Sequence, residues 1–467
     1  MIDTAWRLYA NGNIDSVIVV APSGVHLGWT REQLPMWWPN MDHLHVFEWD
    51  STKASSGTKK YRDYSRRAVQ ADVCVWYAFN VEAFVPKSNA SKMVDYIMRK
   101  RAGTLFIIDE SHVIKTPAAK RTKVVTRLAA KAPFRRCLTG TAVTRTPLDL
   151  FAQYRALDPN VFGTVYQTFK SRYAITKRVQ FGNGKPFDQI VGYRNMDGLR
   201  NRIAPITFVR KKKDSVDVPE RLESVELFEM PKQHRRAYDQ MLQEFRLELE
   251  QDPDIVASNV LVRMLRLHQI SRGYIKHPET GDVVQLPGPT PAADRCATLV
   301  ANNAASGGKT IVWVRFVDDV PTLQQKIVEQ LKEVQQDLDS SCVVTCTGDT
   351  PQEERVELRR RFNEESDAYV WLGTMATGGI GVDLGAANLT VVYSHGFNMG
   401  ERLQALERNY GSTQKASKVD IVDIVAADSI DQLAMQSLAT KKQYAEDASV
   451  YGMSRSDVLD YIQHTGR

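Results

Sequence analysis

The sequence has little cysteine and no long apolar segment. Its 467 residues include five cysteines, and Cys342 with Cys346 would need two further ligands to hold zinc. No apolar run approaches the roughly 20 residues that a membrane-spanning helix requires. The N-terminal stretch MIDTAWRLYANGN lacks the apolar core of a signal peptide. We therefore expect no membrane partner and a cytoplasmic, or cytoplasm-like, location.

The charge balance is only mildly basic. The sequence has 61 lysines and arginines against 55 acidic residues, a net charge of +6 and a pI of about 8.9. This excess permits a polyanionic partner without proving one. With 43% hydrophobic and 25% charged residues, the composition is typical of a soluble globular protein. The length is sufficient for two or three domains.

The central pattern is an apolar run, residues 105–108, that leads directly into Asp109-Glu110-Ser111-His112. An unbroken apolar run predicts a strand buried on both faces, as in a parallel sheet. Ligands bind at the carboxyl ends of such strands. In a nucleotide hydrolase, Asp109 would hold Mg²⁺ and Glu110 would polarise the attacking water. Taken alone, a strand that ends in a polar turn is the simpler interpretation, but the rest of the chain favours the catalytic one.

Alternating strand and helix patterns on both sides of this segment predict an α/β fold with parallel sheets. Strands are expected at residues 16–21, 45–49, 73–79, 105–108, 136–138, 310–314, 342–346, 369–372, 390–393 and 419–424. Helices are expected in residues 1–15 and at about 89–101, 120–131, 148–157, 318–338, 351–364, 401–409 and 428–442. We divide the chain into a first lobe (1–217), a helical insertion and linker (218–290) and a second lobe (291–467). The tryptophans at 29, 37 and 38 are expected in the core.

Several longer segments match a known series of motifs, in the known order. They are VIVVAPSGVHLGWTREQLPMWWP from Val17, DESH from Asp109, LTGTAVTRTPLDLF from Leu138, FVRKKKD from Phe208, LRLHQISRGYIKHP from Leu265, KTIVWVRF from Lys309, TGDTPQEERVELRRRFN from Thr347, GTMATGGIGVDLGAANLTVVY from Gly373 and RLQALERNYGSTQKAS from Arg402. In this order they resemble the motor of superfamily 2 helicases, specifically the Swi/Snf-type DNA translocases. The resemblance implies two tandem RecA-like lobes with a helical insertion between them.

The resemblance also implies ATP and Mg²⁺ as cofactors, bound in the cleft between the lobes. Asp109, in a DEAH-like box, would position Mg²⁺, and Glu110 would orient the attacking water. Residues from the second lobe would contact the phosphates. The implied ATP-binding residues are Asp109, Gln404, Gly379 and Asp383, and the implied catalytic residues are Glu110 and Arg408.

Coupling between hydrolysis and lobe movement is implied for the motif around Thr139, Gly140 and Thr141. His112 would link the DESH motif to the second lobe, although a hydrogen-bonded turn histidine is an equally simple interpretation.

DNA is the implied partner, held mainly through its phosphates near Ser23 and Lys115. Such contacts carry little sequence information, so we expect salt-sensitive binding without strong base preference. The resemblance favours tracking along duplex DNA over strand separation. The compact chain fits a bacterial or viral motor better than a chromatin remodeller.

One departure from the family concerns the phosphate-binding loop. The family binds triphosphate with G-x-x-x-x-G-K-[ST] between its first strand and first helix, and this sequence contains no such stretch. Residues 307–310, GGKT, have Asn303 in place of the required first glycine. They also precede a strand, whereas a phosphate loop opens a helix. Met1 lies on what resembles the helix that follows the loop.

A second departure is Gly411, which stands where the second of two arginines is expected. A missing arginine finger can cost several orders of magnitude in rate. Three explanations remain open: a fragment or late start codon, a remnant that binds DNA without hydrolysing ATP, or a missing part supplied by another polypeptide. The chain is thus expected to be a DNA-dependent ATPase once a phosphate loop is restored, or alternatively an inactive DNA-binding remnant or assembly factor. An unrelated α/β enzyme acting on a small substrate would require the ordered motifs to be coincidence.

Overall fold

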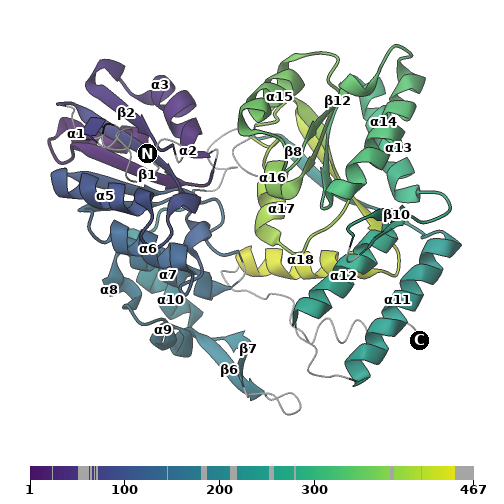
Figure 1. Cartoon of the computed structure of the whole chain (residues 1–467), viewed down its shortest axis with the longest axis horizontal. Helices are drawn as coiled ribbons and strands as arrows, with labels where there is room; N and C mark the ends of the chain where they lie inside the picture. Colours follow the sequence, from purple (N-terminus) through teal and green to yellow (C-terminus); the bar gives the residue numbers. More distant parts are fainter. Residues whose placement is uncertain are drawn as a thin grey trace. The chain divides into compact units, whose positions relative to one another are not determined.

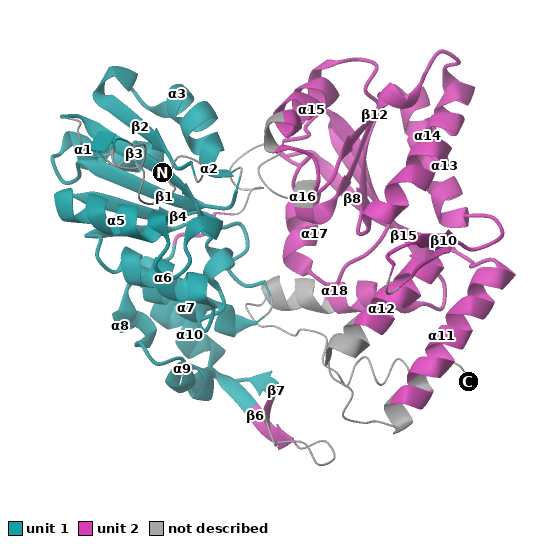
Figure 2. Ribbon diagram, viewed as in Figure 1, with its two compact units in different colours: residues 1–175, 190–207, 448–450 teal, residues 176–189, 208–447, 451–467 magenta. Residues whose placement is uncertain are grey.

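The computed structural model of the chain describes residues 1–446 with internal gaps. The gaps are residues 24, 51–62, 64–65, 68, 70–71, 102, 145, 180–186, 211–217, 252–256, 278–279, 379–382 and 412. The chain divides into two compact units (Figures 1 and 2). The first unit contains Met1–Ile175 and Ile190–Thr207, and the second contains Thr176–Gln189 and Phe208–Asp447.

The first unit is built on a five-stranded parallel sheet in the order β2-β3-β1-β4-β5. Its strands are β1 (Ser16–Ala21), β2 (Leu44–Glu48), β3 (Cys74–Asn80), β4 (Thr104–Ile108) and β5 (Phe134–Cys137). The central strands β1 and β4 are buried along their whole length, as an unbroken apolar run predicts.

Helices cover both faces of this sheet, and β4 shows why. Phe106 and Ile108 point into one apolar core, and Leu105 and Ile107 point into the other, because successive side chains of a strand alternate between faces. The first core is closed by α5 (Asn89–Lys100) and α6 (Lys120–Ala129), and the second by α1 (Ile2–Ala10) and α3 (Leu34–Trp37).

The rest of the first unit packs around a separate aromatic core that includes Phe151, Phe169 and Tyr173. Its helices are α7 (Leu150–Leu157), α8 (Pro159–Phe162), α9 (Tyr166–Tyr173) and α10 (Met196–Ile203). The hairpin strands β6 (Ala174–Val179) and β7 (Phe187–Tyr193) are shared, because Thr176–Val179 and Phe187–Gln189 are grouped with the second unit. Short turns of helix lie at α2 (Val25–Gly28), Trp29–Gln33, Met41–His43, Val81–Ala83, Ser111–Ile114, Pro147–Asp149 and Ala204–Ile206.

The second unit is built on a six-stranded parallel sheet in the order β12-β13-β11-β14-β15-β8. Its strands are β8 (Glu220–Phe228), β11 (Lys309–Val314), β12 (Val343–Cys346), β13 (Val370–Thr374), β14 (Ala387–Val392) and β15 (Lys418–Ala426). Strand β8, which pairs with β15 along nine residues, is not among the strands predicted from the sequence.

Helices and a small hairpin complete the second unit. The helices are α11 (Lys232–Gln251), α12 (Ala257–Ser271), α13 (Pro291–Ala305), α14 (Val320–Val334), α15 (Gln352–Glu364), α16 (Met375–Gly378), α17 (Met399–Leu406) and α18 (Ile430–Glu446). Short turns of helix lie at Val317–Asp319 and Ser340–Cys342, and β9 (Tyr274–Lys276) pairs antiparallel with β10 (Val283–Gln285).

These two parallel sheets, flanked by helices, confirm the predicted α/β fold class. The domain limits 1–217, 218–290 and 291–467 remain a prediction. The expectation that Trp37 is a core residue is wrong: its side chain is 62% exposed, whereas its neighbour Trp38 is buried at 4%. Within the described residues, no helix has the length and apolar character needed to cross a membrane.

Candidate active site

Asp109 lies directly after β4, at the carboxyl edge of the first sheet. Its backbone N–H donates to the carbonyl of Val20 at 2.9 Å, so pairing with the neighbouring strand continues one residue past β4. The indole Nε1 of Trp29 donates to Oδ2 at 2.8 Å, and the backbone N–H of Glu110 donates to Oδ1 at 2.9 Å. Burial raises the pKa of Asp109, and the Trp29 hydrogen bond partly offsets this. The carboxylate is thus held by neutral donors.

Glu110 adopts a left-handed backbone conformation, with φ of 48° and ψ of 52°. This conformation is uncommon outside glycine and is found at functional sites more often than elsewhere. The Glu110 carboxylate lies 3.1 Å from Nδ1 of His112, and it accepts a hydrogen bond from Oγ1 of Thr139 at 3.3 Å. The turn therefore brings Glu110 to the residues assigned to coupling.

The coupling residues form one connected group. Nδ1 of His112 lies 3.2 Å from Oγ1 of Thr139, which also accepts the backbone N–H of Thr141 at 3.1 Å. A Cβ at Gly140 would meet nothing within 4 Å, so no close contact requires glycine there. The structure joins His112 and Thr139 to Glu110, while their roles in coupling remain predictions.

A buried link between the DESH turn and α7 was not predicted. Oγ of Ser111 donates to Oε1 of Gln153 at 2.7 Å, and Nε2 of Gln153 donates to the carbonyls of Ala142 and Asp149 at 2.7 and 2.9 Å. Ser111 is fully buried and Gln153 is 3% exposed. This link fixes the turn that carries the two carboxylates. A glutamine among the largely apolar residues that begin α7 was the signal available in the sequence.

Both predicted DNA contacts already have partners within the chain. The backbone N–H of Ser23 donates to a carboxylate oxygen of Glu82 at 3.1 Å. Nζ of Lys115 donates to Oγ1 of Thr144 at 2.6 Å, and Thr144 in turn donates to Asp149 at 3.1 Å. A phosphate at Ser23 would have to displace a carboxylate, whereas at Lys115 it would displace a neutral hydroxyl.

In the second unit, α17 carries Gln404 and ends just before Arg408. The backbone N–H of Leu384 donates to the carbonyl of Arg408 at 2.9 Å, and Thr413 donates to Oδ1 of Asp383 at 2.8 Å. The structure therefore brings the segments around Asp383 and Arg408 together. The predicted ATP contact at residue 379 lies outside the described residues.

The helix α17 is fixed by an ion pair that the sequence analysis did not predict. Both terminal nitrogens of Arg402 donate to the carboxylate of Asp423, each at 2.7 Å, and the Arg402 and Asp423 side chains are 9% and 3% exposed. A two-pronged arginine–carboxylate pair sets orientation as well as distance. It orients the segment that carries the candidate phosphate contacts.

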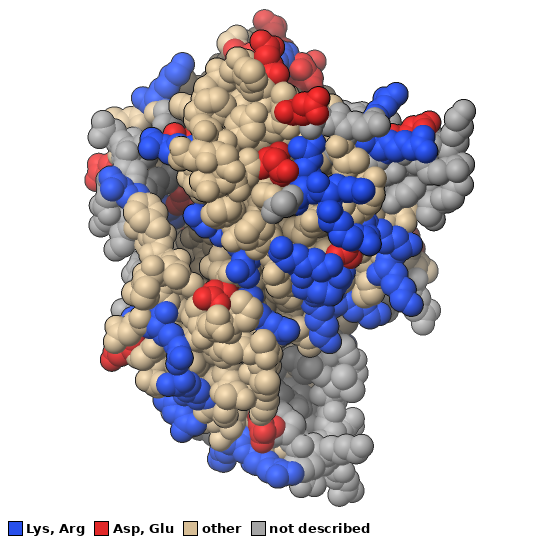
Figure 3. All heavy atoms as spheres, turned by 90° about the vertical axis from the view of Figure 1, so that its left-hand side faces the viewer, with Lys and Arg blue, Asp and Glu red and all other residues tan. Residues whose placement is uncertain are grey.

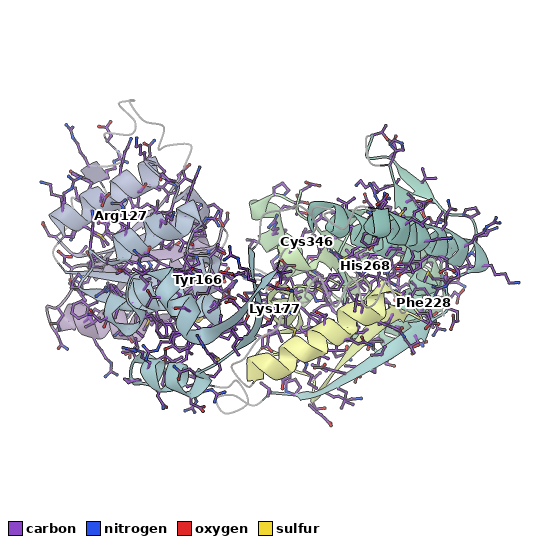
Figure 4. All side chains as sticks on the ribbon, turned by 90° about the horizontal axis from the view of Figure 1, so that it is seen from below. Arg127, Tyr166, Lys177, Phe228, His268 and Cys346 are labelled. Atoms are coloured by element: carbon purple, nitrogen blue, oxygen red, sulfur yellow. The ribbon has the colours of Figure 1, made fainter. Side chains whose placement is uncertain are left out.

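Another group of charged residues is buried between α12 and α18. Arg272 and His268 both approach Asp431, with Nδ1 of His268 3.1 Å from Oδ1 of Asp431, and all three side chains are fully buried. Arg272 also lies over the rings of Phe228 and Tyr393, 5.5 and 5.0 Å from their centroids; His268 and Phe228 are labelled in Figure 4. Burial alone would raise the pKa of Asp431, but Arg272 and His268 hold it well below its usual range.

The GGKT segment is structural, in line with the sequence analysis. Nζ of Lys309 donates to the carbonyls of Phe362 and Glu365 at 2.7 and 2.6 Å. These carbonyls belong to the last turn of α15 and the residue after it, where a cation satisfies free acceptors. Burial lowers the pKa of Lys309.

Mg²⁺ suits Asp109 by the chemistry of its donor. Mg²⁺ keeps several waters and takes one or two carboxylates together with substrate phosphates. Asp109 offers one carboxylate at the ligand-binding edge of a parallel sheet, and its two oxygens accept hydrogen bonds from the neutral donors Trp29 Nε1 and Glu110 N–H. Among the described residues there is no cluster of three or more histidine, cysteine or acidic side chains that would hold a metal without such help.

Two family models match the chain. The SNF2-related domain matches residues 2–279, and the helicase conserved C-terminal domain matches residues 292–410. The chain belongs to the SNF2-related family, whose members are Swi/Snf-type, helicase-like motors of superfamily 2.

Curated relatives are distant and longer. The chain is 23% identical to the ISWI chromatin-remodeling complex ATPase ISW2 of Saccharomyces cerevisiae over 96% of its length, covering 38% of that protein. It is 24% identical to the SWI/SNF-related matrix-associated actin-dependent regulator of chromatin subfamily A-like protein 1 homolog of Caenorhabditis elegans over 86% of its length, covering 51%. It is 21% identical to the DNA annealing helicase and endonuclease ZRANB3 of Bos taurus over 91% of its length, covering 36%. The chain thus spans about a third to a half of these proteins.

A solved structure resembles the chain as well. The Sulfolobus solfataricus SWI2/SNF2 ATPase core, in complex with dsDNA, covers 94% of this chain and 83% of its own, at 20% identity and a TM-score of 0.39. A TM-score of this size supports no further conclusion.

Proposed function

We propose that the chain is the motor of an ATP-dependent DNA translocase that moves along duplex DNA without separating its strands. The observation that carries this assignment is the pair Asp109 and Glu110, which follows a buried strand at the ligand-binding edge of a parallel sheet. In a family of helicase-like motors, this pair is the natural place for hydrolysis.

In this proposal each residue has a task that its contacts suit. Asp109 would hold Mg²⁺, which neutralises phosphate charge when it is bound. Glu110 would orient the attacking water, and its contacts with His112 and Thr139 would report the state of the site to the loop beyond β5. Gln404 and Arg408 of the second unit would contact ATP phosphates, and Asp383 and residue 379 are the further ATP contacts that the family resemblance implies.

Duplex DNA is the proposed partner, and the first unit offers a surface suited to it. Figure 3 shows lysines and arginines gathered on one face of this unit, and Arg127, labelled in Figure 4, lies on that side. Exposed cations of α5, α6, β5 and the turn between α6 and β5 are Lys92, Arg99, Lys100, Lys120, Lys123, Arg127, Lys131 and Arg136. Such a surface attracts phosphates irrespective of sequence. On such a surface we expect salt-sensitive binding without strong base preference.

Turnover requires a phosphate loop that this sequence does not contain. The loop would come from an upstream segment or from another polypeptide. Gly411 would further limit turnover unless Arg408 alone serves the γ-phosphate.

The test is ATP hydrolysis with and without duplex DNA, on the chain as given and on a form fused to an upstream phosphate-loop segment. We expect DNA-stimulated turnover in the fused form only, lost in Glu110→Gln. Glu333→Gln, on the exposed surface of α14 in the second unit, is the matched control and should retain turnover. DNA-stimulated turnover that survives Glu110→Gln would contradict the assignment of the base.

Gly411 together with the missing loop favours one second candidate, a DNA-binding or assembly factor with an inactive motor. DNA binding without turnover in either form, with both forms folded, would support it.

A further inference from the structure

Trp29 begins a local irregularity next to the candidate metal ligand. Residues Trp29–Gln33 form a π-helical turn between α2 and α3. Single π-helical turns are rare and occur frequently at functional sites. At the start of this turn, the indole Nε1 of Trp29 donates to Oδ2 of Asp109 at 2.8 Å, across 80 positions of sequence.

Contacts on both sides hold this turn in place. The ring of Trp29 stacks on Trp76, with centroids 5.8 Å apart and planes 26° apart. The following two residues bind Glu48 at the end of β2: Oγ1 of Thr30 at 2.6 Å, and the guanidinium of Arg31 at 3.1 and 2.8 Å. The Arg31 guanidinium holds the pKa of Glu48 below its usual range, so this anchor stays charged.

Trp29 differs from its neighbours Trp38 and Trp76 in having a hydrogen-bond partner for its indole N–H. The neighbouring rings of Trp38 and Trp76 pack edge to face at 6.1 Å, and the Nε1 atoms of both are buried with no hydrogen-bond partner in the part of the chain that the structure describes. An unpaired buried N–H lowers stability by about 1–3 kcal/mol, and the indole N–H groups of Trp38 and Trp76 are both unpaired in this way. The indole N–H of Trp29, in contrast, donates to a carboxylate.

We propose that Trp29 is a positioning residue for Asp109: its indole N–H fixes one carboxylate oxygen so that the group faces a divalent cation in a single orientation. Partners of metal-bound carboxylates orient the ligand, and their loss typically weakens metal binding by about 10- to 100-fold. Trp29 follows Ser23 by six positions. The residue that holds Asp109 is therefore close in sequence to a predicted DNA contact. This inference rests on the proposed function, in which Asp109 holds the metal.

The test uses the full chain and Mn²⁺ alone, without nucleotide. Free Mn²⁺ is followed by electron paramagnetic resonance in wild type, in Asp109→Ala, and in a chain with β-(3-benzothienyl)alanine at position 29. This analogue keeps the shape of tryptophan and lacks the N–H. Trp76→Phe is the matched control, because it alters the same stack without touching Asp109. Melting temperatures show that each variant is folded.

A second readout follows the hydrogen bond itself. The chain has eight tryptophans, so indole ¹⁵N labelling gives eight cross-peaks, and the Trp29 peak is identified by its absence in the analogue. We expect this peak to move on addition of Mg²⁺ and in Asp109→Ala, while the Trp76 peak stays in place.

We expect Mn²⁺ binding to be lost in Asp109→Ala, to weaken about tenfold in the analogue, and to be unchanged in Trp76→Phe. Wild-type affinity in the analogue, with binding lost in Asp109→Ala, would overturn the role of Trp29 and leave the metal assignment intact. Equal binding in wild type and Asp109→Ala, or none in either, would overturn the metal assignment of the proposed function and this inference with it.

Discussion

The carboxylates of the first unit's candidate site and those buried in the second unit have different partners. Asp109 and Glu110 accept hydrogen bonds from an indole, a hydroxyl and a backbone N–H, and the Glu110 side chain remains 29% exposed. Asp423 and Asp431 are paired with arginines, and their side chains are 3% and 0% exposed.

This difference separates carboxylates that are available for chemistry from those that are structural. A neutral donor orients a carboxylate without cancelling its charge, so the group can still bind a cation. An arginine cancels the charge, and a buried pair of this kind is costly to break. Arg402 belongs to a motif associated with phosphate contacts, yet its pairing with Asp423 gives it a structural role. The partner of a charged group, more than its motif, indicates its function.

The largest effect should come from removing a buried carboxylate. Asp431→Ala leaves the buried cation of Arg272 without its partner, and we expect a loss of about 3–5 kcal/mol in the free energy of unfolding, measured by urea denaturation. Asp239→Ala is the control, because Asp239 is 60% exposed and lies 3.6 Å from Arg235. A surface pair of this kind contributes about 0–1 kcal/mol.

Glu110→Ala sharpens the comparison. The Glu110 side chain is 29% exposed and accepts a hydroxyl hydrogen bond from Thr139, so its loss should cost far less than that of the fully buried Asp431. Equal losses in Asp431→Ala and Glu110→Ala would contradict the division into structural and available carboxylates.

A smaller effect concerns pH. Burial raises the pKa of Asp319 to about 7, although its Oδ2 accepts Oγ of Ser394 at 3.0 Å. Between its unfolded pKa of about 3.9 and 7, the folded state binds the extra proton, so this group lowers stability as pH rises.

Burial lowers the pKa of His268 to about 4. Between pH 4 and about 6.5 the unfolded state binds the extra proton at this histidine, so its contribution to stability rises with pH.

Asp319 and His268 change the free energy of unfolding in opposite directions as pH rises. Removing the Asp319 carboxyl should therefore leave the contribution of His268 visible. In Asp319→Asn, stability between pH 4 and 6.5 should rise with pH more steeply than in wild type, by at most about 1.4 kcal/mol per pH unit. Urea midpoints measured across this range check the slope. Asp420→Asn, whose side chain is 45% exposed beside Lys418, is the control and should leave the slope unchanged. An unchanged slope in Asp319→Asn would mean that Asp319 is ionised in the folded chain throughout.

Much of the fold was predictable because burial leaves a plain pattern in sequence. The strand β4 was predicted from four consecutive apolar residues, and most strands of the second sheet were predicted in the same way. The strand β8 was missed because it lies at the edge of its sheet, where most of its side chains are exposed and charged residues interrupt the apolar pattern. Trp37 was misassigned because it lies on the exposed side of a four-residue helix.

The candidate site was predictable only one segment at a time. The motifs indicated Asp109 and Glu110, but the contact of Asp109 with Trp29 depends on a π-helical turn 80 positions away. The pairing of Arg402 with Asp423 likewise depends on how α17 packs on β15. Composition and spacing do not show which charged side chains form contacts across such distances. These contacts determine which charged groups remain able to bind a ligand.

Lys115 should give the smallest change, and it tests the predicted DNA contact in the first unit. Nζ of Lys115 donates to Oγ1 of Thr144 at 2.6 Å, and a bound phosphate would replace this hydroxyl. Lys115→Met should cost about 1 kcal/mol of stability and should lower the slope of log affinity against log salt by about one, for binding to duplex DNA of any sequence. Fluorescence anisotropy at several salt concentrations measures the slope.

Lys326→Met is the matched control, because Lys326 is similarly placed at a surface but is paired with the carboxylate of Asp294 at 3.0 Å. If both variants lower the slope equally, the loss reflects net charge and Lys115 touches no phosphate. If only Lys115→Met lowers it, Lys115 contacts a phosphate, as the sequence analysis predicts for this position, and the effect cannot be assigned to net charge alone.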